Sequence, residues 1–571
     1  MNTALKVTIA FMLSLCLISC GNQQQQAETA DHIFINGKVY TVDDDAPWAA
    51  AVGVKDDEII FVGPKEDLEK FIGPKTEQHD LGGRLLLPGF IDSHTHTVLG
   101  GGYVNALSVG PQASPDDLLT EISAYAEDNK DLPVVFGFGY NSTVFGQNGP
   151  TKEMLDSVVP DRPAFLMDEG FHSGWANSKA MERLEINKDT PDPVPGFDFY
   201  KRDEGGNPTG WFYEATATKA MQDLNVFSVE SVTAGTKDVF DIMNGYGITA
   251  AYEAGDFEMT ALAPAVHKRL EENNGYNIRM VGSYLVTSRE QLGDAIEKLE
   301  ALSEATKAAQ QHIRVLKILN DGTVEARSAG MYEEYQGEPG NNGSILLSQE
   351  ELTTLVTEAA ARDIDVHVHA LGERTIDQTL NAIEAAQTAH GDSDTRYTIC
   401  HIQIMKREAI ERFSKLNVIA QGTPLWASYD SLGKQFLSED QFNRSYLFKS
   451  LKEAGVRLTF GSDYPSTGAG SLGISPLYNI EIGHTRQNAG EPEGLIQPPM
   501  SERLSLEDMV RGYTIDAAYQ LGMEDQIGSI EVGKKADLII LEKNLFEVDT
   551  YEINEIKVDL TMMNGNIVYR K

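Results

Sequence analysis

Leu86-Leu87-Pro88-Gly89-Phe90-Ile91-Asp92-Ser93-His94-Thr95-His96 decides the fold, because this apolar run ends in two histidines spaced two residues apart. A short apolar run of this kind favours a buried strand. Side chains two apart in a strand point to the same face, so His94 and His96 can present two imidazoles to one metal ion. A His-x-His pair alone is as often solvated or packed as metal-bound. The metal hypothesis therefore depends on where other ligand-type residues fall.

Seven further short apolar runs follow this strand, with helical patterns between them. They predict strands at residues 248–252, 278–285, 313–319, 364–369, 397–401, 418–421 and 457–460. Eight such units close a barrel, so the sequence predicts an α/β fold with a (β/α)8 TIM-type barrel over residues 88–522. Roughly 150 residues separate the first two strands, far more than one helix needs. This predicts an inserted subdomain between barrel strands 1 and 2, at residues 100–241.

The two ends of the chain resemble each other. The segments from His32 to Tyr40 and from Thr561 to Tyr569 each read as strand, Asn-Gly turn, strand, which predicts two β-hairpins. Further short apolar runs lie between Ala49 and Leu87 and at residues 536–541. The simplest arrangement is one small β-sandwich built from both chain termini, residues 31–87 and 523–571, with the barrel inserted into it.

The N-terminus has the residue order of an export signal. Lys6 precedes an apolar run, Val7 to Ile18, that is too short for a stable membrane span but suits a signal-peptide core. The following Ser19-Cys20 resembles the end of a bacterial lipobox. We expect residues 1–19 to be a lipoprotein signal peptide, Cys20 to carry the lipid anchor and residues 20–30 to be a linker. The protein would then be exported and anchored in the cell envelope, at the periplasmic side or the cell surface. The alternative is a cytoplasmic protein with an apolar start.

Composition narrows the class of protein. The chain has 571 residues, 41% of them apolar, and a net charge of −39. That charge repels phosphate backbones, so we expect no nucleic-acid partner. After signal removal and lipidation only Cys400 is left as a free thiol, so no intrachain disulfide is expected. Its place in an apolar strand indicates a small core residue rather than a nucleophile.

Ligand-type residues stand at the ends of four other predicted barrel strands. They are Lys317 in the fourth strand, His369 in the fifth, His401 in the sixth and Asp463 after the eighth. The carboxyl ends of barrel strands meet at one open mouth, where barrel enzymes keep their chemistry. With the histidine pair, five strands thus direct such side chains to one point.

Two of these assignments have competitors. His367 lies one strand step before His369 on the same face, and we favour His369 because it stands at the strand end. Lys317 could be an ordinary buried lysine paired with Asp321. Histidines without an apparent converging partner are interpreted as structural or exposed, namely His32, His79, His267, His312, His390 and His484.

Together these residues resemble the amidohydrolase superfamily of metal-dependent hydrolases, over nearly all of the mature chain. Within it the chain is similar to the branch of the N-substituted formamide deformylases, the YtcJ-like or amidohydrolase 3 group. The motifs that indicate this branch are Leu155-Asp156, Pro160-Asp161-Arg162-Pro163, His172-Ser173-Gly174-Trp175, Pro208-Thr209-Gly210, His369-Ala370-Leu371-Gly372-Glu373-Arg374 and the closing Gly528 to Leu538. The branch more often has Asp where Glu373 stands, a change that preserves the charge.

The resemblance implies a site for one or two metal ions. The histidine pair of the first strand and Asp463 would hold one ion, the histidines of strands five and six the second, and Lys317 would bridge them. A free ammonium has no lone pair to give a metal, so the lysine would have to be N-carboxylated. Nitrogen and carboxylate donors suit Zn²⁺, while Fe, Mn and Co also fit such a set.

The resemblance also implies a reaction. It is hydrolysis of a C–N amide bond of a small molecule, an N-substituted formamide or N-acyl amide, by metal-activated water with Asp463 as general base. His172 and Trp175 in the insert are candidates for substrate contact, although a turn cap and a core aromatic are their ordinary roles. Two alternatives stay open: the same fold used for cyclic imide or ester hydrolysis or isomerisation, and a non-catalytic ligand-binding surface lipoprotein. A homodimer is also left open.

Overall fold

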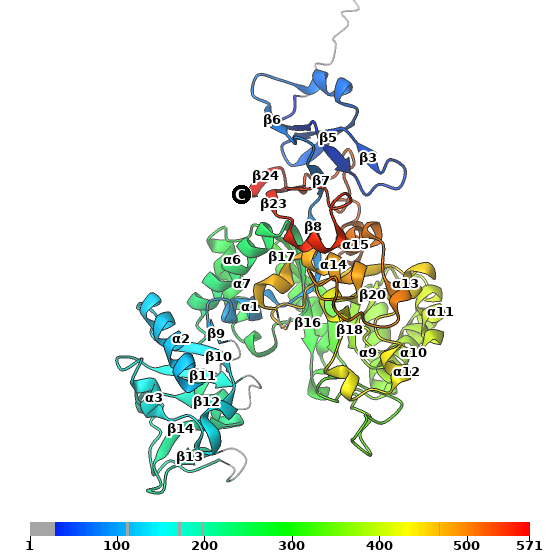
Figure 1. Cartoon of the computed structure of the whole chain (residues 1–571). Helices are drawn as coiled ribbons and strands as arrows, with labels where there is room; N and C mark the ends of the chain where they lie inside the picture. Colours follow the sequence, from blue (N-terminus) through cyan, green and yellow to red (C-terminus); the bar gives the residue numbers. More distant parts are fainter. Residues whose placement is uncertain (1–28, 110–113, 169–172, 194, 196–198, 467–468) are drawn as a thin grey trace, which may run out of the picture.

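The computed structural model describes residues 29–109, 114–168, 173–193, 195, 199–466 and 469–571. In this part of the chain a β-sandwich stands at one end of a barrel, and an inserted subdomain lies at the other end (Figure 1). The predicted signal peptide, Cys20 and His172 lie outside the described residues. No described helix is both long and apolar enough to cross a membrane.

The barrel is a sheet of eight parallel strands arranged in sequence order. They are β8 (Phe90–Thr95), β15 (Ile248–Glu253), β16 (Arg279–Val286), β17 (Gln311–Leu319), β18 (Asp365–Ala370), β19 (Tyr397–His401), β20 (Ile419–Gly422) and β21 (Leu458–Phe460). Beyond β21 the amide of Asp463 donates to the carbonyl of His94 over 2.7 Å, which joins the last strand to the first. The predicted TIM-type barrel is therefore confirmed.

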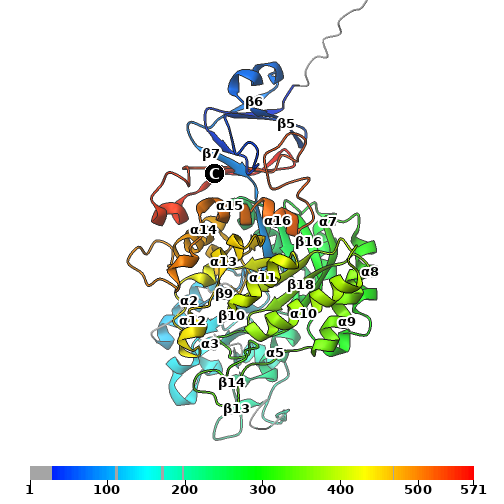
Figure 2. The same ribbon diagram turned by 90° about the vertical axis from the view of Figure 1, so that its right-hand side faces the viewer.

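Helices cover the outside of this sheet (Figure 2). They are α1 (Thr97–Tyr103), α6 (Val229–Gly245), α7 (Ala263–Glu272), α8 (Ala295–Thr306), α9 (Gln349–Ala360), α10 (Glu373–Ala389), α11 (Arg407–Lys415), α13 (Phe448–Glu453), α14 (Pro476–Thr485), α15 (Leu506–Gly512) and α16 (Ile515–Gln520). The short helix α12 (Glu439–Phe442) packs instead among loops. The helix α10 shows why the others cover the sheet: Ile376, Leu380 and Ile383 recur at helical spacing and are all buried. Its neighbour α9 is capped by Ser348, which forms a capping box with Glu351.

Two sheets form the β-sandwich. One consists of β5 (Glu58–Gly63), β4 (Ala51–Lys55), β1 (His32–Ile35) and β6 (Glu77–Asp80); the other consists of β24 (Asn566–Arg570), β23 (Val558–Met563), β22 (Leu538–Leu541), β7 (Leu85–Pro88), β2 (Lys38–Tyr40) and β3 (Trp48–Ala49). The second sheet joins strands from both chain ends, because β7 pairs with β22. Buried side chains from both ends, such as Phe34, Leu86 and Leu538, make one core between the sheets.

The two predicted hairpins differ in outcome. Around Asn564-Gly565 the strands β23 and β24 pair antiparallel, as expected. Around Asn36-Gly37 the prediction is wrong, because β1 pairs in one sheet and β2 in the other. The chain crosses from one sheet to the other at Gly37. A Cβ there would stand 2.4 Å from the Cβ of Leu81, so only glycine fits.

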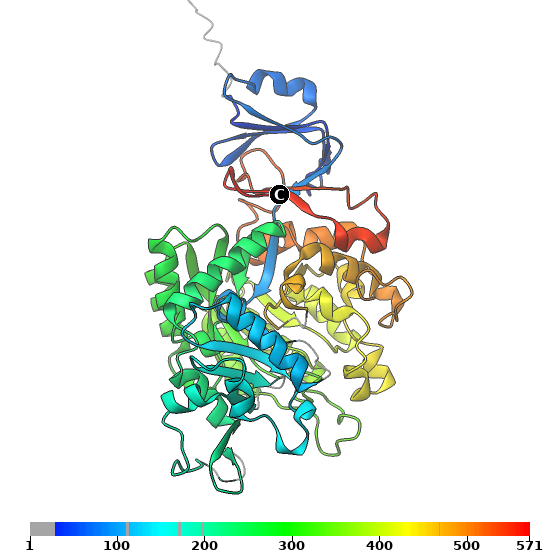
Figure 3. The same cartoon turned by 60° about the vertical axis from the view of Figure 1, so that its left-hand side comes forward.

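The insert has a six-stranded sheet of its own, and the insert faces the viewer in Figure 3. In spatial order its strands are β13 (Tyr200–Arg202), β14 (Pro208–Tyr213), β12 (Ser173–Ala176), β11 (Ala164–Asp168), β10 (Val135–Tyr140) and β9 (Leu107–Ser108). Its helices are α2 (Pro115–Asp128), α3 (Lys152–Asp156), α4 (Ser178–Arg183) and α5 (Ala215–Asp223). The helix α6, which follows, packs on α1 and belongs to the barrel layer.

Candidate metal centre

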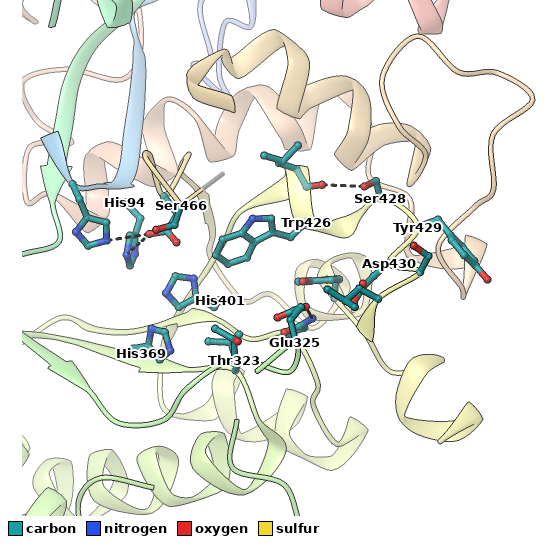
Figure 4. A pocket seen from close by; sticks show the side chains of 18 of the residues that line it. His94, Thr323, Glu325, His369, His401, Trp426, Ser428, Tyr429, Asp430 and Ser466 are labelled. Carbon is teal, nitrogen blue, oxygen red and sulfur yellow. Dashed lines mark hydrogen bonds and ion pairs between the residues drawn. The ribbon is translucent and has the colours of Figure 1, made fainter. Parts of the chain in front are cut away.

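All six predicted ligands line one pocket of about 600 Å³. Because β8 continues directly from the sandwich strand β7, the carboxyl ends of the parallel barrel strands face away from the sandwich (Figure 1). The pocket opens at this end, and Figure 4 shows the imidazoles of His94, His369 and His401 gathered along one side of it. The expected convergence of five strand ends thus takes place in the structure, with His94, His96, Lys317, His369, His401 and Asp463 as its members.

The first strand and the segment after the last one supply a compact group of three ligands. Oδ1 of Asp463 lies 3.1 Å from Nε2 of His96 and 3.3 Å from Nε2 of His94. Nδ1 of His96 lies 2.7 Å from the carbonyl oxygen of Gly255. A carbonyl only accepts, so Nδ1 carries the proton and Nε2 keeps its lone pair for a metal.

Asp92, the acidic residue of the opening motif, holds the backbone beside these three ligands through hydrogen bonds. Its carboxylate accepts from the amide of His94 at 3.1 Å, the amide of Ser462 at 3.0 Å and the hydroxyl of Ser462 at 2.6 Å. Burial raises the pKa of Asp92 to about 6, although the hydrogen bonds from Ser462 and His94 oppose that rise. Asp463 itself has a φ of 53°, a strained conformation that these hydrogen bonds hold in place.

His369 and His401 form the second group. Their ring centroids are 4.5 Å apart, and Nε2 of His369 and Nδ1 of His401 are both buried without a hydrogen-bond partner. Burial, helped by the charge of Lys317, lowers the pKa of His369 to about 3, and burial also lowers that of His401. Neutral imidazoles with orphaned nitrogens are the form that a metal binds.

The structure distinguishes His369 from its competitor. His367 lies one step deeper in β18, with its ring stacked on Tyr252 at 4.7 Å between centroids. Its Nε2 is 3.1 Å from Nδ1 of His94, and it does not line the pocket. His367 therefore orients the ligand His94 from behind, while His369 reaches the pocket.

Lys317 is fully surrounded, with 1% of its surface exposed. Its Nζ lies 3.2 Å from Nε2 of His94 and 3.3 Å from Sγ of Cys400, and in the described chain no carboxylate lies within 4.0 Å of it. Asp321 instead accepts from the amides of Gly330, Leu371 and Gly372. Burial lowers the pKa of Lys317, which favours the neutral amine that carboxylation requires.

Comparison with known proteins decides the family. A model of the amidohydrolase family matches residues 77–569. The chain belongs to the amidohydrolase family. It is 29% identical to YtcJ of Bacillus subtilis over 94% of this chain and 99% of the relative. It is 26% identical to the N-substituted formamide deformylase of Arthrobacter pascens over 95% and 98% of the two chains. These matches confirm the resemblance found in the sequence motifs.

A solved structure shares the fold of this amidohydrolase. An uncharacterized metal-dependent hydrolase from Pyrococcus horikoshii superposes with a TM-score of 0.72 and 22% identity, covering 91% of this chain and 99% of the other.

Family membership makes the protein a hydrolase of carbon–nitrogen bonds and implies a divalent metal. The residues fit such an ion, because two ligand groups, His94-His96-Asp463 and His369-Cys400-His401, each bring their donor atoms within 4.8 Å of one another. Burial raises the pKa of the Cys400 thiol to about 12, so it stays protonated, in keeping with a core residue.

Several residues of this amidohydrolase site escaped the sequence analysis. Glu253 ends β15 and accepts from the amide of Thr97 at 2.7 Å; burial, together with the charge of Asp256, raises its pKa to about 8. An acidic residue directly after an apolar run was the available signal. No sequence signal pointed to the outer pocket residues Glu325 and Gln403, because they lie on loops whose path the sequence does not reveal.

The surroundings of Trp175, and those of His32 and His79, differ from the ones predicted for them. Trp175 has no exposed surface, packs in a core of the insert, and donates its indole N–H to the carbonyl of Thr151 over 2.8 Å. It is not among the pocket residues, which indicates a packing role. His32 and His79 do converge, contrary to expectation: Nδ1 of His32 lies 3.0 Å from Nε2 of His79, because β1 and β6 pair in parallel.

Proposed function

We propose that this amidohydrolase cleaves the C–N amide bond of a small molecule of the N-substituted formamide or N-acyl amide type. The observation that carries the proposal is that all six ligand side chains line one wide, open pocket. A relative 26% identical over 95% of the chain is named for N-substituted formamide deformylation, which supports this substrate class. Such a pocket is large enough to enclose a small organic substrate.

We propose Zn²⁺ as the metal, held by His94, His96 and Asp463 on one side and by His369 and His401 on the other, with a carboxylated Lys317 between them. When bound, the ion would polarise the scissile carbonyl and lower the pKa of water. Imidazole and carboxylate donors suit zinc, and the orphaned nitrogens of His369 and His401 give it two vacant ligand atoms. Fe, Mn and Co compete for the same donors.

Asp463 is the proposed general base. Its carboxylate takes a proton from the attacking water and delivers it to the amine nitrogen as the C–N bond breaks, which makes the amine a better leaving group. Nδ1 of His96 donates to the carbonyl of Gly255, and the backbone amide of His94 donates to the carboxylate of Asp92; both bonds keep the imidazoles in position during this transfer. The carboxylic acid product and the free amine then leave through the pocket mouth.

The metal-loaded protein should be assayed against N-formyl, N-acyl and cyclic amides with matching esters. We expect turnover of simple amides, and Asp463→Asn should lower kcat by about 10²–10⁴-fold while metal stays bound. Asp525→Asn, the same change at an exposed residue outside the pocket, serves as control. Turnover of esters or isomerisable compounds with no turnover of any amide would refute the proposal.

Metal identity and lysine carboxylation have separate tests. Elemental analysis of the purified protein should find zinc at one or two ions per chain. After equilibration with ¹³C-bicarbonate, a carbamate signal should appear in the NMR spectrum and be absent from Lys317→Arg. Full metal occupancy without a carbamate signal would remove Lys317 from the ligand set.

We also propose that the protein is exported and anchored in the cell envelope through lipid on Cys20. The order of Lys6, the apolar run and the lipobox-like cysteine supports this. The wild-type protein should partition with membranes, and Cys20→Ser should not, although its activity is kept. Partition of both variants with the cytosol would contradict the anchor. A homodimer stays a prediction that light scattering can check.

A further inference from the structure

The pocket has two chemically different sides. In Figure 4 the ligand histidines lie on one side, Glu325 and Asp430 lie on the other, and the ring of Trp426 stands between them. Glu325 belongs to the loop that follows β17, and Asp430 to the loop that follows β20. Neither carboxylate takes part in the metal site described above. Asp430 accepts from the amide of Gly433 over 2.7 Å, which holds its carboxylate at the edge of the pocket.

The surroundings of Glu325 offset only part of the negative charge of its carboxylate. Its Oε1 accepts one hydrogen bond, from Nε2 of Gln403 at 3.0 Å. Burial raises the pKa of Glu325, and the negative charge of Asp430 adds to the rise. In the described chain, neither Glu325 nor Asp430 has a lysine or arginine nitrogen within 4.0 Å. Two negative groups therefore face the pocket without a counter-charge.

Gln403 supplies an independent sign of a missing ligand. Only 2% of its surface is exposed, and its Oε1 is buried without a hydrogen-bond partner. Because a carboxylate only accepts, Gln403 must turn its amide N–H toward Glu325, which leaves Oε1 as an unused acceptor. An unpaired buried acceptor is destabilising, so a donor from a bound molecule would relieve it.

The other described side chains of this wall are also suited to a cation. Trp426 provides an aromatic face, and hydroxyls such as that of Ser428 can accept further hydrogen bonds. Lys317 is the one lysine or arginine among the described pocket residues, and it lies with the metal ligands on the opposite side. Lys434 lies behind this wall and donates to the hydroxyl of Tyr429 over 2.7 Å, but it does not line the pocket. The pocket face of the wall thus offers acceptors and negative charge.

We propose that Glu325, Asp430 and Gln403 form a cation-binding subsite for a protonated amine on the substrate. The ammonium group would donate to the carboxylate of Glu325 and to Oε1 of Gln403, with Asp430 adding negative charge. The preferred substrate is then an N-acylated amine that carries a positive charge at the end remote from the scissile amide. This inference rests on the proposed amide hydrolysis and adds the class of the amine.

The test compares three N-acyl amides of equal chain length. The remote end carries an ammonium group, a methyl group or a carboxylate. Because a charge-assisted hydrogen bond contributes about 1.5–3 kcal/mol, the cationic substrate should exceed the neutral one in kcat/KM by roughly 10–100-fold, and the anionic one should be poorest. Rising ionic strength should reduce the preference.

Glu325→Gln should bring the ratio of cationic to neutral substrate close to one. Glu334→Gln, the same change at an exposed position of the same loop, should keep the wild-type ratio. If Glu325→Gln does not fold, inhibition of the wild type answers the question: a primary alkylammonium ion should inhibit more strongly than the alcohol of equal length.

The possible outcomes separate the two proposals. Equal turnover of all three amides, or equal inhibition by ammonium ion and alcohol, overturns the cation subsite and leaves amide hydrolysis standing. Loss of the preference in Glu334→Gln as well as in Glu325→Gln would show that surface charge causes it, which also overturns the subsite. No turnover of any amide refutes the proposed function itself.

Discussion

Gly461→Ala is the sharpest test of how this amidohydrolase holds its ligands. Gly461 follows β21 and lies against β8, the strand that carries His94. A Cβ at this position would stand 2.4 Å from the backbone nitrogen of His94, 2.8 Å from Oδ1 of Asp92 and 2.9 Å from the Cβ of His94. Heavy atoms do not approach a Cβ this closely, so something must move.

The size of the movement follows from these contacts. Relief of the contact with the His94 nitrogen to about 3 Å needs a shift of roughly 0.6 Å, and the atom belongs to the backbone of a barrel strand. Asp92 cannot yield freely, because it bonds His94 and Ser462. The shift therefore separates His94 from Asp463. Overpacking of this kind costs about 1–3 kcal/mol of stability. A ligand displacement approaching 1 Å lowers the rate by up to about 10²-fold.

We expect Gly461→Ala to lower kcat/KM for an amide by about 10–100-fold and to reduce the metal content after dialysis. Gly293→Ala is the matched control, because a Cβ there meets nothing within 4 Å and the residue has no positive φ. Metal content, kcat/KM and the denaturation midpoint should be measured for both variants. Equal values for Gly461→Ala and Gly293→Ala would refute the claim that close contact at Gly461 sets the ligand geometry.

Three further predictions follow from the structure. Burial lowers the pKa of His267 to about 4, so the unfolded chain takes up a proton between pH 6.5 and 4 that the folded chain does not. The free energy of unfolding should fall by roughly 3 kcal/mol as the pH falls through this window, and His267→Gln should remove that part of the slope in urea titrations at several pH values. Trp175→Phe loses the hydrogen bond to Thr151 and should lower stability by about 1–2 kcal/mol with KM unchanged, whereas a raised KM at full stability would indicate substrate contact. Chelation of the metal should abolish turnover and lower the melting temperature, and added Zn²⁺ should restore both; activity that survives complete metal removal, measured by elemental analysis, would contradict a metal-dependent reaction.

Local sequence patterns were sufficient to predict the barrel and the residue types of the candidate ligands. Each strand is a short apolar run, and the alternation of side chains along a strand places His94 with His96 and His367 with His369 whatever the rest of the chain does. The same local rules failed at Asn36-Gly37, where the turn residues suit a hairpin but the close approach to Leu81 sends the two strands into different sheets.

The sequence alone determined the family, the order of the strands and which residue types stand at their ends, because all three depend on short-range periodicity and on motifs of adjacent residues. Only the tertiary structure decided that His369 rather than His367 reaches the pocket, that Trp175 is part of a core, and that Glu325 lies beside Gln403. The depth of a side chain in a barrel depends on the stagger of all its strands, and the wall of the pocket depends on loops that meet only once the barrel has closed.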